Sequence, residues 1–599
     1  MSSSTDTTRA PSAPHGLADR LAAIALPWLV LAAVLLLAAV RLALDPSAYF
    51  RDPDDAARLL QVRALLAGAP WHETTIPGLG GAEPLLSHWS RIVDAPLASL
   101  TVLLDVVLPT VAAEWLTRVI WPLALLGIAV LVIATAAERR GGRDAALAAI
   151  VMSVLCLAAT SQFLPGRIDH HNAQILAAVA GVLLLSQAFS QPRLGTPAGA
   201  VLGLGMSVGY EALLLVVGGL GAAVLYATIA RRGRAAVGDA AVAFAVVLAA
   251  AFFLTIPPAR WLDVRCDALS LNMVMLAGIA ATGLVVTFRR LALGPLAHRL
   301  AALVLTGGVA LAVYVAAEPA CLAGPFGQVD PAIRPIWLDH VSETQSILGL
   351  TSNAPVAASI MVLHLVLALG ATMALLRTDR DATMHVFAAA LLIAAASSLW
   401  QLKLAPYAAL LGVVPIAIVI GRMPTSGQTR PTLTRLLVAL AASQAALGLA
   451  AGILLGAPKD EALRFAERVR AASACLSRSA VEPLAGPPPG LAVSDLELGP
   501  YIAALTPSRA LSAPYHRLDR QILATHAILR TSLDGAARGL AESGIDYVVL
   551  CPPMAGGLRN VELPPGSLYA ALVAGSVPAF LEPVALPATS PLGVWRVRR

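Results

Sequence analysis

Residues 21–44 read LAAIALPWLVLAAVLLLAAVRLAL, and the acidic segment YFRDPDDAARLLQVR follows at residues 49–63. The first stretch is long enough to span a bilayer, which takes about 20 apolar residues. It exceeds the apolar core of a signal peptide and no A-x-A cleavage site closes it, so we expect a retained first span. The acidic segment directly outside this span is then a candidate functional loop.

The rest of the chain continues this apolar pattern. Of its 599 residues, 58% are hydrophobic and 13% are charged, whereas soluble domains are about half apolar and a quarter charged. The sequence therefore predicts a polytopic α-helical membrane protein. The net charge of +6 does not indicate nucleic-acid binding, because the basic residues lie in short loops between apolar runs.

The apolar runs predict about thirteen spans, centred near residues 33, 127, 154, 181, 201, 220, 246, 278, 308, 366, 391, 411 and 444. With the N-terminus in the cytoplasm, a basic loop follows every even-numbered span, as the positive-inside rule requires. Residues 139–143 and 231–234 are two such loops. We therefore predict a bacterial inner-membrane protein with a cytoplasmic N-terminus and a periplasmic C-terminus.

This layout divides the chain into three parts. We expect a disordered cytoplasmic tail at residues 1–20, a membrane domain at 21–456 and a small periplasmic α/β domain at 457–599. Two long external loops, residues 45–94 and 318–354, interrupt the membrane domain. In the last part, the short apolar runs LAVS at 491–494 and YVVL at 547–550 predict buried strands, and residues 521–534 and 535–543 predict helices.

The chain has five cysteines, and Cys156 lies within a predicted span. The other four fall on the predicted external side, where disulfides persist. We predict a disulfide between Cys475 and Cys551 in the C-terminal domain and another between Cys266 and Cys321, which would join two loops. Four free thiols are the alternative. No C-x-x-C spacing supports a zinc ribbon.

The first external loop carries three carboxylates, Asp52, Asp54 and Asp55, immediately before a helix-like stretch. Proline after Asp52 suits the first position of a helix, so capping is the structural explanation of these acids. The same loop carries HWSR at residues 88–91, a dense polar and aromatic cluster that includes His88 and Arg91.

Three further segments offer groups for chemistry. PGRIDHHN at residues 165–172 places Asp169 and His171 two positions apart, and a carboxylate and an imidazole both bind divalent cations. A polar helix cap is the alternative there. The loop at residues 318–354 contributes Glu343. Lys403 lies at the mouth of a span, where an ionisable group is costly and usually functional, unless it only snorkels to the interface.

The order and sidedness of these motifs resemble the STT3/PglB-like branch of the GT-C glycosyltransferases, the catalytic subunits of oligosaccharyltransferases and their relatives. Asp52-Pro followed by Arg58 looks like the family's first acidic motif, although alignment through Arg63 would place Asp54 on the metal-binding aspartate. Asp169-His-His falls at the second acidic motif, with His171 in place of its second acid.

Two more motifs extend the resemblance over residues 20–456. VSETQ at residues 341–345 is similar to the family's S-V-S-E-H-Q motif, with Glu343 on the functional glutamate, and Lys403 lies near the family's phosphate-binding arginine. The resemblance implies a GT-C fold and a metal-dependent, inverting transfer of a sugar from a polyprenyl-phosphate or polyprenyl-diphosphate donor on the external leaflet.

The resemblance also implies roles for individual residues. Mg²⁺ or Mn²⁺ would be held by Asp52 or Asp54 with Asp169 and His171. Asp52 or Asp54 would accept the acceptor's proton, Glu343 would orient acceptor and metal, and Lys403, Arg91 and His88 would bind the donor. The membrane lipid would surround the donor's polyprenyl tail.

The C-terminal part departs from the family, because it contains no W-W-D-Y-G motif. The acceptor is therefore expected to differ from an asparagine sequon and to be a lipid, a glycan or a protein. A transporter or flippase is one alternative, although transporters gather binding residues near the midplane of repeated halves. A noncatalytic envelope scaffold is another, and it leaves the acidic motifs unexplained.

Overall fold

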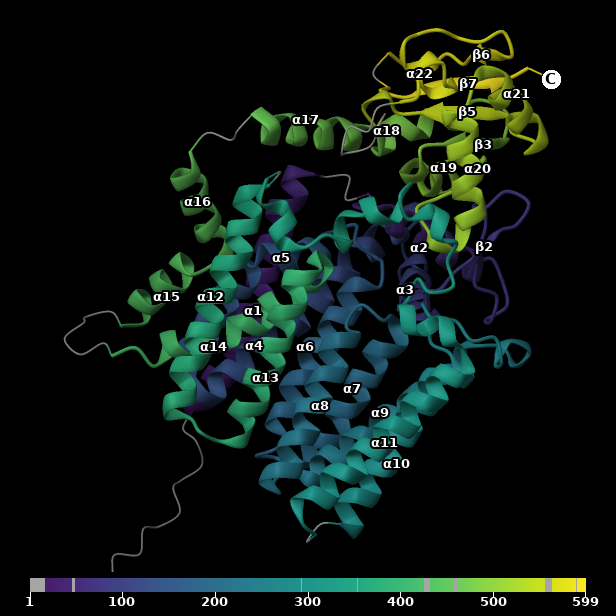
Figure 1. Cartoon of the computed structure of the whole chain (residues 1–599). Helices are drawn as coiled ribbons and strands as arrows, with labels where there is room; N and C mark the ends of the chain where they lie inside the picture. The colour runs from purple at the N-terminus through teal and green to yellow at the C-terminus, as the bar shows by residue number, and fades with distance from the viewer. Residues whose placement is uncertain are drawn as a thin grey trace, which may run out of the picture.

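Long apolar helices make up most of the computed structural model, which describes residues 17–45, 49–291, 294–352, 354–424, 431–456, 460–554, 563–588 and 590–598. Helix α1 begins at Leu17, so residues 17–20 of the predicted tail are helical, and residues 1–16 lie outside the described residues. The helices form an elongated bundle, and the C-terminal residues form a separate unit at one end of it (Figure 1).

Nine of the described helices are long and apolar enough to cross a membrane, or ten if a bent pair is one span. The protein is thus a polytopic α-helical membrane protein. The nine are α1 (Leu17–Leu44), α4 (Thr110–Val154), α8 (Leu213–Ala230), α9 (Arg234–Thr255), α10 (Leu271–Arg290), α11 (Leu296–Ala317), α12 (Pro355–Thr378), α13 (Ala382–Trp400) and α14 (Ala405–Gly421).

The other four predicted spans fall on helical segments that do not meet this length criterion. Two are the short helices α6 (His171–Gln187) and α7 (Gly195–Val208), and one is the bent pair α15 (Pro431–Ala441) and α16 (Gln444–Leu455). The fourth is the second part of α4. Gly142 interrupts that helix with φ 75° and ψ −171°, a conformation that glycine adopts without steric cost.

Close backbone approaches hold the short helices inside the bundle. A Cβ at Gly199 of α7 would lie 1.9 Å from the carbonyl oxygen of Ala240 in α9. Small residues let membrane helices approach this closely. Helices α6 and α14 are largely buried, and α6 begins at His171, within the second acidic motif.

The C-terminal unit contains a five-stranded sheet in the order β4-β3-β5-β7-β6. The predicted strands at 491–494 and 547–550 are its central strands β3 and β5, which are parallel. The sheet comprises β3 (Leu491–Ser494), β4 (Arg509–Ala510), β5 (Tyr547–Leu550), β6 (Leu581–Pro583) and β7 (Gly593–Val597), with α19 (Gly499–Leu505), α20 (Asp519–Arg530), α21 (Leu533–Glu542) and α22 (Leu568–Val573) beside it.

Two disulfides join segments that lie outside the long apolar helices. Cys475, at the end of α17 (Asp460–Cys475), is bonded to Cys551, which directly follows β5. Cys266 is bonded to Cys321 across two loops of the membrane domain. These are the two pairs expected from the sequence, and Cys156 is a buried free thiol.

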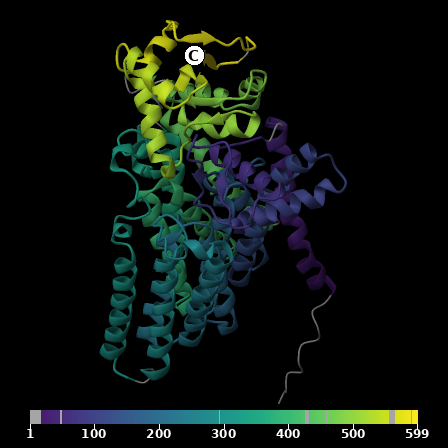
Figure 2. The ribbon, with the colours of Figure 1, turned by 90° about the vertical axis from the view of Figure 1, so that its right-hand side faces the viewer.

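The C-terminal unit packs on the segment between α1 and α4, in which α2 (Pro53–Leu66) is followed by β1 (Thr75–Ile76), β2 (Leu85–Leu86) and α3 (Arg91–Asp105) (Figures 1 and 2). Ala57 of α2 and Ile522 of α20 belong to one buried apolar cluster. Arg63 of α2 donates a hydrogen bond of 2.9 Å to the carbonyl of Ala504. The unit therefore covers the acidic start of α2.

Candidate active site

Asp52 and Asp54 have different environments at the start of α2. Asp52 is the N-cap, and its Oδ1 accepts a hydrogen bond of 3.0 Å from the backbone amide of Asp54. Its other oxygen lies 3.3 Å from Nη1 of Arg167. Asp52 therefore has the capping role that was the structural explanation for these acids. The side chain of Asp54 is not part of the cap.

Asp55 joins α2 to the second acidic motif. Its buried carboxylate accepts hydrogen bonds from the amides of Ile168 at 2.8 Å and Asp169 at 3.2 Å. Arg167 lies 3.5 Å from the same carboxylate and also pairs with Asp169. This network fixes the loop between α5 (Leu157–Thr160) and α6 against the first turn of α2.

Asp54, Asp169 and His171 converge on one point. Each offers a ligand atom, and these atoms lie within 4.8 Å of one another. Burial, together with the charges of Asp52, Asp169 and Glu343, holds the pKa of Asp54 well above its usual range. Two carboxylates and an imidazole are a donor set for a divalent cation, whose charge would relieve this repulsion.

Two of the other predicted residues lie beside this group. The charge of Glu343 acts on both Asp54 and His171, so the loop at 318–354 reaches the cluster. The charge of Lys403 acts on Glu211. Glu211 lies 2.9 Å from Nε2 of His170, and the rings of His170 and His171 are 4.4 Å apart. Lys403 therefore lies on the His170 side of the cluster.

Arg91 lines the same cavity as His170 and Glu211, but its guanidinium already has partners within the chain. Its buried guanidinium lies 3.0 Å from Asp94 and donates to the backbone carbonyls of Trp71, Gln61 and Glu73. Arg58 pairs with the other oxygen of Asp94 at 2.6 Å. Arg91 thus supports the fold of the first loop, and its contact with a substrate phosphate stays a prediction.

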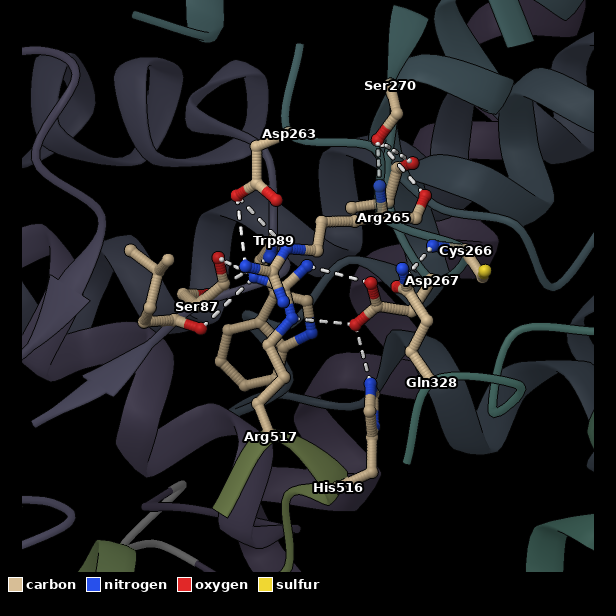
Figure 3. Close-up of polar contacts among 12 residues, drawn as sticks. Ser87, Trp89, Asp263, Arg265, Cys266, Asp267, Ser270, Gln328, His516 and Arg517 are labelled. Carbon is tan, nitrogen blue, oxygen red and sulfur yellow. Dashed lines mark hydrogen bonds and ion pairs between the residues drawn. The ribbon is translucent and has the colours of Figure 1, made fainter. Parts of the chain in front are cut away.

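His88 belongs to a second cluster, with Asp267 and His516, whose ligand atoms also lie within 4.8 Å of one another. His516 and Arg517 both point at Asp267 (Figure 3). The two guanidinium contacts to Asp267 are 2.7 and 2.8 Å. Burial and the neighbouring His516 lower the pKa of His88 well below its usual range, so its imidazole is neutral.

Trp89 connects the two clusters. Its ring lies 5.4 Å from that of His88 and 5.8 Å from that of His170. A cavity of about 70 Å³ runs along this side, with Glu211 and Arg517 also in its lining. The predicted residue His88 is thus near the site but faces the C-terminal unit.

The C-terminal unit adds groups that the sequence did not reveal. Burial and the charges of Asp52 and Glu343 raise the pKa of Glu497 to about 8. Tyr515 donates a hydrogen bond of 3.2 Å to the carbonyl of Pro53, at the start of α2. Neither residue lies in a motif. Arg167 was also missed, although its place two residues before Asp169 in PGRIDHHN was a usable signal.

Comparison with known proteins identifies the fold. No protein-family model and no curated protein sequence matches the chain. The structure is similar to the apo oligosaccharyltransferase of Archaeoglobus fulgidus, with a TM-score of 0.66 and 13% identity over 93% of this chain and 80% of that one. The chain has the GT-C fold of the STT3 type.

Two further structures of the archaeal oligosaccharyltransferase share this STT3-type fold. One is described as a complex with an inhibitory peptide and a dolichol-phosphate, and it matches 91% of this chain and 72% of its own with a TM-score of 0.61 and 14% identity. The other is a complex with Zn and sulfate, with a TM-score of 0.57 and 14% identity over 90% and 70% of the two chains. The STT3-type fold accounts for the helical bundle and the C-terminal unit together.

Proposed function

We propose that the protein is a metal-dependent, inverting glycosyltransferase. It would move a sugar from a polyprenyl-phosphate or polyprenyl-diphosphate donor to an acceptor at the external face of a bacterial inner membrane. The observation that carries this proposal is the convergence of Asp54, Asp169 and His171 at one end of an STT3-type bundle. The archaeal neighbour described with a dolichol-phosphate supports a polyprenyl carrier.

The donor set fits a divalent cation. Asp54, Asp169 and His171 would hold the cation. The neighbouring carboxylates repel the charge of Asp54, and a bound cation would offset this repulsion. A bound cation neutralises negative charge on a leaving phosphate. An imidazole ligand suits Mn²⁺ better than Mg²⁺, which binds through oxygen and water. We therefore propose Mn²⁺ as the preferred ion, of the two that the sequence analysis left open.

The surrounding side chains suggest the remaining steps. An acceptor atom attacks the anomeric carbon on the face opposite the phosphate, the bond from that carbon to the phosphate oxygen breaks, and the phosphate leaves with the electron pair. Asp54 accepts the proton lost by the acceptor, and Glu343 orients the acceptor. Lys403 binds the phosphate as a compact cation with three donors, and His88 contacts the donor from the cavity that it lines with Glu211.

The position of the C-terminal unit supports a role in acceptor binding. It covers the start of α2 and brings Glu497 and Tyr515 beside the acidic cluster. A pKa of about 8 leaves Glu497 protonated at neutral pH, so its carboxyl can donate as well as accept a hydrogen bond. Such a group suits a hydroxyl or amide acceptor on a lipid, a glycan or a protein.

Transfer of radiolabel from polyprenyl-linked sugars tests this function. Membranes containing the protein should label a new product, and EDTA or Asp169→Ala should abolish the labelling. Asp534→Asn, at an exposed position of α21, is the matched control and should transfer normally. If folded protein transfers nothing from a broad panel of donors, the transporter and scaffold alternatives are favoured instead.

A further inference from the structure

A cavity of about 530 Å³ opens between α4, α6, α13 and α14, at the end of the bundle away from the C-terminal unit (Figure 1). Its volume lies within the range of about 300–1,000 Å³ that is usual for small-molecule sites. The proposed glycosyltransferase site is at the other end of the same helices. The cavity is therefore a separate site, which the proposed function does not use.

The lining of the cavity is positively charged. Arg139, Arg140 and Arg422 line it, and no described carboxylate does. Asp381 pairs with Arg140 at 2.9 Å, and Asp379 pairs with Arg422 at 2.7 Å, but neither acid is part of the lining. These acids bond two of the three guanidinium groups through both terminal nitrogens, so Arg139 carries the charge of the lining that no described acid offsets.

Among the three arginines that line the cavity, Arg139 is the one that can bind a ligand without giving up an ion pair. It is exposed, and no hydrogen bond or ion pair joins it to the described part of the chain. Its neighbour Arg143 differs, because it lies 3.7 Å from Glu138 and does not line the cavity. A ligand anion would therefore meet Arg139 without displacing an acid.

The cavity also contains neutral polar groups with unused capacity. The Oε1 atom of Gln187 is buried and has no hydrogen-bond partner among the described residues. A buried polar atom of this kind normally has a partner, in the protein or in bound water or ligand. Thr383 lies in the same lining, while Leu183 and Phe387 form an apolar wall beside it.

We propose that this cavity binds the phosphate group of an anionic phospholipid. The arginines would take the phosphate, Gln187 and Thr383 would hydrogen-bond the glycerol or headgroup hydroxyls, and an acyl chain would lie along the apolar wall. Basic pockets between helices on the cytoplasmic side bind lipid headgroups in this way. An inorganic phosphate has the same charge chemistry, and the experiment separates the two sources.

Native mass spectrometry of the full-length protein in phosphatidylglycerol nanodiscs tests the proposal. Arg139→Ala should reduce retention of phosphatidylglycerol about fivefold, the effect of one arginine near an anionic lipid. Arg143→Ala removes a cation four residues along the chain, just past the break at Gly142, and should leave retention unchanged. A second cavity variant, Gln187→Leu, should also reduce retention while keeping the charge.

The controls decide between the outcomes. Equal retention of phosphatidylglycerol by Arg139→Ala, Arg143→Ala and the wild type would overturn the proposal. The proposal would also fail if the wild type retained phosphatidylcholine as well as it retains phosphatidylglycerol. Adding inorganic phosphate identifies the source of the ligand. Displacement of the lipid by phosphate, lost in Arg139→Ala, would show that the phosphate group alone is recognised. Lipid retention that resists phosphate would show that the acyl chains are part of recognition.

Discussion

The carboxylate of Asp55 accepts a hydrogen bond of 2.8 Å from the backbone amide of Ile168. This contact joins two segments that are 113 residues apart in the sequence. It sets the first turn of α2 against the loop that carries Asp169 and His171, so the proposed metal ligands come from two elements held in fixed relation. Asp55 itself is fully buried and lies behind the ligands.

Removing this anchor should weaken metal binding. Asp55→Ala leaves the amides of Ile168 and Asp169 without their acceptor, so we expect a 10- to 100-fold lower affinity for Mn²⁺, the usual cost of losing a residue that supports ligands. Asp55→Asn keeps one acceptor oxygen, so its affinity for Mn²⁺ should lie between those of the wild type and Asp55→Ala. Calorimetric titration with Mn²⁺ measures both, and an unchanged affinity in Asp55→Ala would contradict the role given to this contact.

The two candidate aspartates of α2 can be distinguished by one isosteric change at each. Asparagine caps helices as well as aspartate does, and the Asp52 side chain is 33% exposed beside Arg167, so Asp52→Asn should keep transfer within about threefold. Asp54→Asn removes a proposed metal ligand and should reduce transfer by about 100-fold or more. The opposite pattern in the radiolabel assay would assign the metal to Asp52.

His171 should determine which cation the protein prefers. Replacing its imidazole with a carboxylate turns the donor set of Asp54, Asp169 and His171 into an all-oxygen set, which suits Mg²⁺. We expect His171→Asp to raise the ratio of Mg²⁺-supported to Mn²⁺-supported transfer about tenfold or more over the wild type. The two rates are measured after EDTA treatment and metal addition. An equal ratio in both proteins would mean that His171 is not a ligand.

Much of the bundle was predictable, because membrane thickness fixes the length of a spanning apolar run. Of the thirteen predicted spans, nine fall on described helices that are long and apolar enough to cross a membrane, or ten if the bent pair is one span. Helices α6 and α7 are shorter, and the close approach of Gly199 in α7 to Ala240 in α9 depends on how the helices pack. Apolar length alone could not predict such contacts.

The candidate site was predictable where ligands come in short motifs. Asp54, Asp169 and His171 were all named from sequence, and the structure brings them together. Arg91 was placed with the donor because the family resemblance implied that role. Sequence could not show that its guanidinium also contacts Asp94 and three carbonyls, because their positions depend on the path of a folded loop.

Glu497 was missed because its position depends on how the C-terminal unit docks. Its pKa of about 8 predicts a specific dependence of stability on pH. An unfolded glutamate titrates near about 4.3. Between these values the folded state keeps the proton and the unfolded state releases it, so this group lowers the free energy of unfolding as pH rises.

Glu497→Gln should remove that dependence. The variant and the wild type should have similar melting temperatures near pH 4, and the variant should melt higher at pH 8 to 9. Thermal unfolding is followed in EDTA, so that metal binding does not add its own pH dependence. Asp495, whose burial raises its pKa to about 6, is retained in both proteins and contributes equally. If the melting temperatures of the variant and the wild type change with pH in parallel over the whole range, the environment assigned to Glu497 is wrong.

The contact between Arg517 and Asp267 should hold the C-terminal unit on the membrane domain (Figure 3). The side chains of Arg517 and Asp267 are 14% and 8% exposed, and breaking a buried pair leaves an uncompensated charge, at a cost of about 3–5 kcal/mol. His516 remains beside Asp267 in Arg517→Ala at 2.6 Å, so we expect the lower part of this range.

The neighbouring pair of Arg265 and Asp263 provides the control, because its side chains are 47% and 40% exposed. An exposed pair contributes about 0–1 kcal/mol, so Arg265→Ala should barely change docking. Hydrogen exchange of the amides in α20 and β4 measures the opening of the unit directly. Faster exchange in Arg517→Ala alone would show that a single buried contact positions Glu497 and Tyr515 over the acidic cluster. Equal exchange in both variants would mean that the apolar cluster of Ala57 and Ile522 holds the unit without it.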